Sequence, residues 1–133
     1  MSAENYVNGP GAGEKLGHKF WYSQAIIVGN TVKCSGQGGW DADGNVPADN
    51  AAQQVDNTFA NIDRLLQSAG LRGWEDVLSV RSYHVSMSKT LDLYIARLRQ
   101  RIPCHRPVST VLGVPELADA RMLIELEVEA KKQ

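Results

Sequence analysis

Hydroxyl and amide side chains are concentrated in the segment YSQAIIVGNTVKCSGQGGW, which covers residues 22–40. They flank two runs of apolar and β-branched residues, and they are Tyr22, Ser23, Gln24, Ser35 and Gln37. Such groups donate and accept hydrogen bonds, so each needs a partner where it lies beside a buried strand. What these groups bind is the first question that the sequence raises.

Three glutamates at alternate positions, Glu125, Glu127 and Glu129, form a second set of residues that could do chemistry. On a strand this spacing places all three on one face. A buried carboxyl group with carboxylate neighbours has a raised pKa and suits proton transfer. If that face meets water, the three are solvated surface charges instead.

The histidines and cysteines do not form a metal-binding pattern. His18, His84 and His105 have no short spacing to one another or to Cys34 and Cys104, and the chain has no CxxC motif. Two cysteines without a secretory signal do not predict a disulfide framework. We therefore expect no metal and no other cofactor.

The composition predicts one folded domain over residues 1–133, because 43% hydrophobic and 22% charged residues are close to globular averages. A net charge of -1 argues against nucleic-acid binding. No apolar run approaches the roughly 20 residues of a membrane span, and the N-terminal residues lack the apolar core of a signal peptide. We expect a cytoplasmic protein that does not bind membranes.

The N-terminal third predicts a hairpin behind an arm. Residues 1–19 are rich in glycine and polar side chains and predict an extended arm with little helix. Residues 20–28 are aromatic and β-branched and predict a strand. Gly29 and Asn30 then predict a tight turn into a second strand over residues 31–37.

Two stretches have the apolar period of an amphipathic helix. The first, residues 50–69, begins with a capping pattern at Asn50, and Gly70 follows where a helix commonly ends. The second, residues 90–102, is ended by Pro103.

Three further strands are predicted over residues 77–87, 108–114 and 122–130. The order is then β-β-α-β-α-β-β, an α+β fold. Two helices cover only one face of such a sheet. Because exposed apolar area commonly marks an interface, we expect a homo-oligomer in which sheet packs against sheet.

Three of these segments, in this order, resemble the YjgF/Rid family of reactive intermediate deaminases: YSQA at 22–25, VKCSGQ at 32–37 and IELEVEA at 124–130. The resemblance implies a chorismate-mutase-like fold, a six-stranded mixed sheet with two helices on one face. It also implies a homotrimer with small-molecule pockets between subunits, into which the hydroxyls and amides noted above would face.

The resemblance also implies roles for single residues. Glu125 corresponds to the family glutamate that positions or activates water, and Tyr22 corresponds to a tyrosine of the pocket wall. Ser35 matches a family serine, and Gly36 beside it would let a ligand approach the backbone closely. Tyr22 as a packed aromatic residue is an equal alternative.

The chain departs from the family at its carboxylate-binding arginine, a residue whose planar guanidinium suits that task. Within CHRPVSTVLGV, residues 104–114, either Ser109 or Val108 stands in its place. Arg106 lies two or three residues upstream and would replace it only if the loop before the strand is remodelled.

Two aromatic features border the expected cleft. Phe20 and Trp21 stand where the family has Gly-Pro, which adds bulk at the cleft mouth. Trp40 follows a glycine-rich loop and either covers the pocket as a lid or packs into the domain.

The resemblance, taken with these features, implies a Rid-type homotrimeric enzyme that hydrolyses an imine or enamine of a small reactive metabolite, or catalyses a related proton transfer. The missing arginine indicates a substrate other than a standard 2-imino acid, and the bulk of Phe20 and Trp21 indicates a more apolar one. The alternative is a non-catalytic trimer that binds a small ligand or a protein partner.

Overall fold

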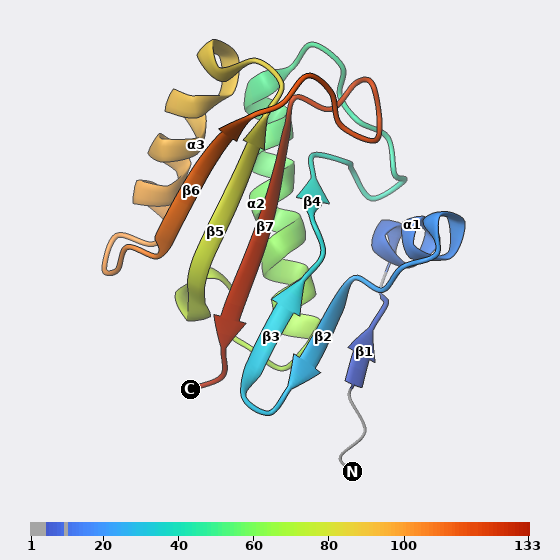
Figure 1. The fold of residues 1–133 in the computed structure, drawn as a ribbon, viewed down its shortest axis with the longest axis vertical. Coiled ribbons are helices and arrows are strands. Elements are labelled where there is room, and N and C mark those ends of the chain that lie inside the picture. Colours follow the sequence, from blue (N-terminus) through green and yellow to red (C-terminus); the bar gives the residue numbers. More distant parts are fainter. Residues whose placement is uncertain (1–4, 10) are drawn as a thin grey trace.

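The computed structural model describes residues 5–9 and 11–133, which form a mixed sheet with helices on one face (Figure 1). The strands of the described residues are β1 Asn5–Val7, β2 Ala25–Val28, β3 Thr31–Cys34, β4 Gln37–Gly38, β5 Val77–His84, β6 Val108–Gly113 and β7 Ile124–Lys131. The helices are α1 Ala12–Phe20, α2 Ala51–Ser68 and α3 Met87–Arg101, and a short 3₁₀ helix, Trp74–Asp76, precedes β5.

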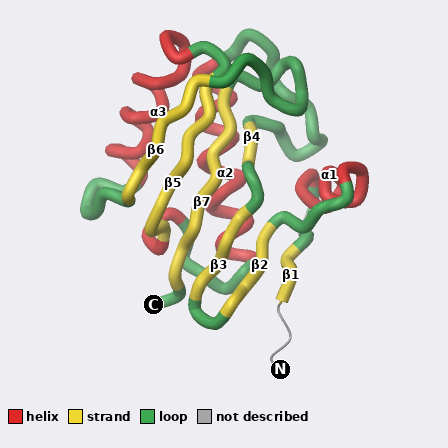
Figure 2. The backbone as a smooth tube through the Cα atoms, viewed as in Figure 1, coloured by secondary structure: helices red, strands yellow, loops and turns green. Residues whose placement is uncertain are grey.

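The sheet has the order β1-β2-β3-β7-β5-β6, and β4 pairs with β7 beyond the end of β3. β5 and β6 are parallel, whereas the other pairs are antiparallel. α2 and α3 lie together behind the sheet, and α1 stands apart at its edge (Figures 1 and 2). The predicted α+β class, the mixed sheet and the helix-covered face are confirmed. The described residues contain seven strands instead of six, and a third helix, α1.

The prediction of an extended arm over residues 1–19 is wrong for the part that the structure describes. Asn5–Val7 pairs with β2, and Ala12–Phe20 is helical. Internal glycines disfavour a helix, so the sequence pattern did not predict α1. Packing requires glycine at Gly17, because a Cβ there would lie 2.6 Å from the carbonyl oxygen of Tyr22.

The predicted hairpin is confirmed, with different strand lengths. β2 begins five residues later than expected because Phe20 ends α1. Gly29 has φ 60°, and Val28 pairs with Thr31 across a two-residue turn. The second predicted strand, residues 31–37, is divided into β3 and β4.

Both ends of α2 form as the sequence predicts. The side-chain oxygen of Asn50 accepts a hydrogen bond from the Gln53 amide at 3.1 Å. At the other end Gly70 has φ 89°, and the Leu71 amide donates to the Leu66 carbonyl at 3.0 Å, which is a Schellman arrangement.

The remaining elements place the glutamates. Along β7 the glutamates lie on the face that the helices leave uncovered, and the buried apolar residues are Ile124, Leu126, Val128 and Ala130. α3 begins at Met87, three residues earlier than predicted, and ends before Pro103. β6 is the exposed edge strand.

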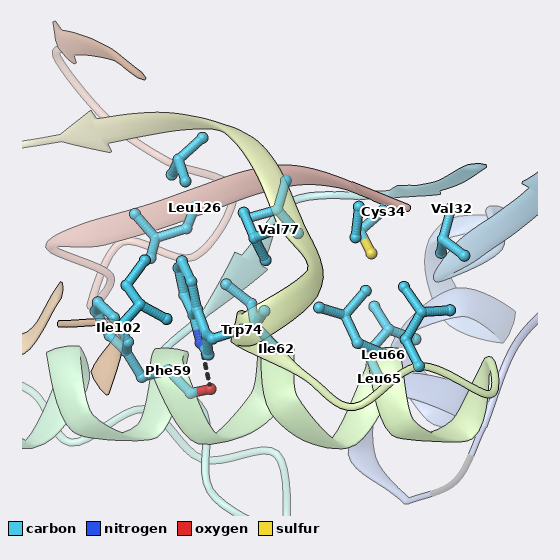
Figure 3. Packing of buried hydrophobic residues seen from close by; sticks show 14 of the residues in the cluster. Val32, Cys34, Phe59, Ile62, Leu65, Leu66, Trp74, Val77, Ile102 and Leu126 are labelled. Carbon is cyan, nitrogen blue, oxygen red and sulfur yellow. Dashed lines mark hydrogen bonds between the residues drawn. The ribbon is translucent and has the colours of Figure 1, made fainter. Parts of the chain in front are cut away.

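The core between sheet and helices centres on aromatic residues. Phe59 stacks on Trp74 with ring centroids 4.5 Å apart, and the Trp74 indole donates to the Phe59 carbonyl at 3.1 Å (Figure 3). Tyr94 of α3 packs against the Phe59 ring. Cys34 is buried beside α2, as the alternation of β3 predicts, and burial raises the pKa of its thiol to about 12.

His84 is a buried structural residue. Its Nδ1 lies 2.6 Å from Thr90 Oγ1, and its Nε2 lies 2.9 Å from Ser82 Oγ. Thr90 donates its own proton to the Ser86 carbonyl at 3.2 Å, so it accepts from Nδ1–H, and Ser82 donates to Nε2. Burial lowers the pKa of His84, which keeps the ring neutral.

Replacing His84 with Gln is expected to destabilise the protein more at about pH 7.5 than at about pH 5. Unfolded His84 takes up a proton below its ordinary pKa of about 6.5, whereas burial lowers the folded pKa. The contribution of neutral His84 to the free energy of unfolding is therefore present above about pH 6.5, and the wild-type protein loses part of it as the pH falls through that value. Urea unfolding at both pH values measures the difference, and His18→Gln, at an exposed position, is the control. An equal loss at both values would contradict the prediction.

Candidate functional site

Five of the seven residues that the sequence nominated line one cavity of about 590 Å³, here called the Glu125 cavity. They come from three parts of the chain and are Tyr22, Ser35, Gly36, Trp40 and Glu125. α1, the loop after β4 and the segment before β7 complete the wall with Leu16, Lys19, Phe20, Gly44, Val46, Ala118, Asp119, Arg121 and Met122. The cavity is formed within a single chain.

Glu125 lines this cavity from the start of β7. Its carboxyl group rests against Gly36, and any Cβ at that position would overlap it. Glycine at 36 therefore makes room for the carboxyl group, not only for a ligand as the sequence suggested. Burial, and next the charge of Glu127, raise the pKa of Glu125. Among the described residues no hydrogen bond contributes to this shift, so the oxygens of Glu125 are available to a ligand.

Tyr22 lines the same cavity, close enough for the charge of Glu125 to act on its phenol. Its amide donates to the Gly17 carbonyl at 3.0 Å, which fixes the backbone where α1 ends. Burial raises the pKa of the phenol, a hydrogen bond with Gln24 opposes this, and the charge of Glu125 raises it further. Tyr22 is therefore a neutral hydrogen-bond donor beside Glu125, not an aromatic residue buried in the core.

The amides of the opening segment have structural roles, which corrects the expectation that they face a cleft. Gln24 and Gln37 are 2% and 3% exposed. Gln37 Nε2 donates to Gln24 Oε1 at 2.9 Å, and Gln24 Nε2 donates to the Gly13 carbonyl at 2.7 Å. The pair ties α1 to the hairpin.

Ser35 combines both roles. Its amide donates to the Gln24 carbonyl at 2.8 Å, and its hydroxyl donates to the Ser23 carbonyl at 2.7 Å. Its hydroxyl proton is therefore engaged, and the oxygen remains free to accept a hydrogen bond in the Glu125 cavity.

Trp40 is a fixed wall and not a lid. It is 8% exposed, and Asn61 Nδ2 donates to its carbonyl at 3.0 Å and to the Gly38 carbonyl at 2.8 Å. Asn57 Nδ2 donates to the Gly39 carbonyl at 3.1 Å. Three bonds from α2 therefore hold the glycine-rich segment in place.

The other two nominated residues lie away from the Glu125 cavity. Leu112 of β6 is level with Glu125, because both pair with Tyr83. Arg106 is exposed and six residues upstream of Leu112, about 20 Å along an extended chain. Ser109 pairs with Val80 on the helix side of the sheet. Within one chain, neither residue reaches the carboxyl group of Glu125.

Sequence reasoning missed two cations and one carboxylate in the cavity wall: Lys19, Arg121 and Asp119. Arg121 Nε and Nη2 donate to Asp119 at 3.0 and 2.7 Å, and these bonds hold the pKa of Asp119 at about 2. Lys19 was hidden because its helix was not predicted. Arg121 stands in a loop without periodic pattern, where only the short spacing to Asp119 was a signal.

Two kinds of feature are missing from the described residues. They contain no group of three or more His, Cys, Asp or Glu side chains that could hold a metal ion. They also contain no helix that is long and apolar enough to cross a membrane.

Comparison with known proteins identifies relatives of the whole domain. The sequence model of the family described as Endoribonuclease L-PSP matches residues 14–132. The solved structure of protein YJGH is 27% identical, with a TM-score of 0.81 over 96% of this chain and 93% of its own. RidA from the Antarctic bacterium Psychrobacter sp. is 25% identical, with a TM-score of 0.76 over 83% of this chain and 87% of its own.

A third structure supports the fold alone. Rv2704 of Mycobacterium tuberculosis, a member of the YjgF/YER057c/UK114 family, is 24% identical, with a TM-score of 0.80 over 97% of this chain and 99% of its own. No curated protein matches this chain in sequence.

Replacing Gly36 with Ala is expected to lower the pKa of Glu125, because the new methyl group pushes the carboxyl group from its buried position toward solvent. A ¹³C NMR titration of the glutamate carboxyl groups measures this value. Gly113→Ala is the matched control, since a Cβ there meets only Met87 at an ordinary 3.7 Å. An unchanged titration of Glu125 in Gly36→Ala would show that the contact does not govern its pKa.

Proposed function

Since the chain belongs to the Endoribonuclease L-PSP family, which includes the YjgF and Rid proteins, we propose that it hydrolyses the imine or enamine of a small reactive metabolite. The observation that carries this proposal is the pairing of Glu125, whose pKa is raised, with the neutral phenol of Tyr22 in one cavity. A carboxyl group with a raised pKa is a better proton acceptor than an ordinary one, and it can return that proton within the same reaction.

The proposed reaction adds water to a C=N bond. As the water oxygen bonds to carbon, the C=N electron pair moves to nitrogen, and Glu125 takes a proton from the water. Glu125 then gives this proton to the nitrogen, which yields a carbinolamine. Glu125 next takes the hydroxyl proton of the carbinolamine and passes it to the nitrogen, so that the C–N bond breaks, an amine or ammonia leaves and the carbonyl forms. Tyr22 donates a hydrogen bond that orients the reactants, and Ser35 Oγ accepts one from a substrate N–H group.

The family description refers to RNA cleavage. The Glu125 cavity contains two carboxyl groups beside its two cations, and the chain has a net charge of -1. This charge balance does not favour a phosphate backbone as ligand. We therefore place the proposal on a small molecule.

Replacing Glu125 with Gln is expected to lower the rate of imine hydrolysis about 10²- to 10⁴-fold, the usual contribution of a positioned acid–base group. The assay offers 2-imino acids generated in situ by an amino-acid oxidase, with semicarbazide trapping as readout. Glu129→Gln is the matched control, because Glu129 lies on the same face of β7 but outside the cavity. Ser109→Ala should also remain active.

Full activity of Glu125→Gln would contradict this mechanism. If the wild-type protein accelerates no imine or enamine hydrolysis yet binds small apolar ligands, the alternative of a non-catalytic binding protein replaces the enzyme.

We further propose that the chain works as a homotrimer whose sheets face one another. The helices leave one face of the sheet uncovered (Figure 2). β6 is exposed at every position, with Val108 72% exposed. Glu125 and Glu127 belong to the uncovered face, so a neighbouring copy seated there would border the Glu125 cavity.

Sedimentation equilibrium at micromolar concentration is expected to give three times the chain mass of 14.6 kDa. Val108→Lys should shift the protein toward smaller species, because it places a charge in a face that becomes buried. Leu93→Lys, on the exposed side of α3, is the control. A folded wild-type monomer at this concentration would contradict the trimer.

A further inference from the structure

Two cations stand in the wall of the Glu125 cavity, and neither comes from β6, where the resemblance places the family arginine. Lys19 belongs to the last turn of α1, and Arg121 lies three residues before β7. Among the described residues Lys19 forms no ion pair. It is therefore available to a bound anion.

Both cations interact with the carboxylate of Asp119. Arg121 donates two parallel hydrogen bonds to the Asp119 carboxylate, at 3.0 and 2.7 Å, and the charge of Lys19 also contributes to lowering the pKa of that carboxylate. This is the geometry in which a guanidinium binds a carboxylate. Arg121 Nη1 donates to no described residue, so the guanidinium retains capacity for a second acceptor.

The remaining wall is largely apolar. Leu16, Phe20, Val46 and Met122 line it together with Trp40. The Lys19 ammonium group lies 5.2 Å from the centroid of the Phe20 ring, so cation and apolar surface adjoin. A volume of about 590 Å³ lies in the range of cavities that hold drug-sized ligands and exceeds what a three-carbon acid fills.

We propose that Lys19 and Arg121 bind the carboxylate of the substrate, in place of the arginine that β6 lacks, and that the apolar wall takes a large aromatic or branched side chain. The substrate class is then a 2-imino acid with a bulky apolar side chain. The reaction named here rests on the proposed function, whereas carboxylate binding does not. In this proposal the pair supplies the carboxylate recognition that the resemblance assigns to the missing arginine.

The test measures binding without turnover, by calorimetry on the full chain. The probes are 3-phenylpropanoate and its uncharged amide, 3-phenylpropanamide. The acid is expected to bind at least about tenfold more tightly than the amide, the scale of a hydrogen bond to a charged group. Lys19→Met and Arg121→Met should each remove about this advantage and leave amide binding unchanged.

Matched variants distinguish specific binding by Lys19 and Arg121 from a general effect of the protein's net charge. Lys15→Met, on the same helix but outside the cavity, should bind the acid as the wild type does. Asp119→Asn should tighten acid binding, because it removes the internal competitor for both cations. Arg121→Lys should retain part of the advantage, which distinguishes lost charge from lost folding.

Equal affinity for acid and amide, no binding of either probe, or unchanged acid binding in Lys19→Met and Arg121→Met would overturn the proposal. Glu125→Gln should retain acid binding and lose turnover. Acid binding without any turnover by the wild type would leave the carboxylate site standing and overturn the enzyme proposal. If the wild type turns over imines and neither cation variant changes KM, the enzyme proposal stands and the carboxylate site is overturned.

Discussion

The position of the Glu125 carboxyl group is the constraint on which the candidate site depends. Its neighbours along β7, Ile124 and Leu126, are fully buried against the helices, so strand alternation directs Glu125 to the opposite face. Turning the carboxyl group away would require pulling these side chains out of the core, at a cost of several kcal/mol. Gly36 supplies the space that the carboxyl group occupies. The core thus fixes the acid in surroundings that disfavour its charge.

A network of buried amides holds the opposite wall. The segment from Gln37 to Trp40 is too closely packed for side chains at Gly38 and Gly39. A Cβ at Gly38 would overlap the side chain of Met122, and one at Gly39 would overlap the backbone of Gln54 in α2. Such a bare segment leaves carbonyl groups that need donors. Asn57 and Asn61 of α2 supply them. The polar residues of this region therefore divide into a structural set and the few that reach the cavity.

Sequence patterns predicted the features that arise from periodicity and turn chemistry, and missed those that depend on close packing. The strand at Glu125, the turn at Gly29 and the cap at Asn50 each obey local rules. α1 does not follow these local rules. Its Gly17 disfavours a helix, but packing requires glycine there because a Cβ would overlap the Tyr22 carbonyl oxygen. The resemblance pointed to four cavity residues, Tyr22, Ser35, Gly36 and Glu125, and the glycine-rich loop pointed to Trp40. The resemblance also indicated the bulk of Phe20 at the cleft, but gave no signal for α1 itself or for Lys19.

The short segment at the end of α1, residues 19–22, contributes to both the charge and the shape of the Glu125 cavity. Trp21 ends α1 with φ 61°, a left-handed conformation that costs a non-glycine residue about 1–2 kcal/mol. The sharp turn lets Lys19 and Phe20 on one side of it, and Tyr22 on the other, line the same cavity. Where a Gly-Pro pair would present no side chain of this size, this chain brings a cation, an aromatic ring and a phenol to one site. The strain at Trp21 is thus accounted for by the three neighbours that it positions.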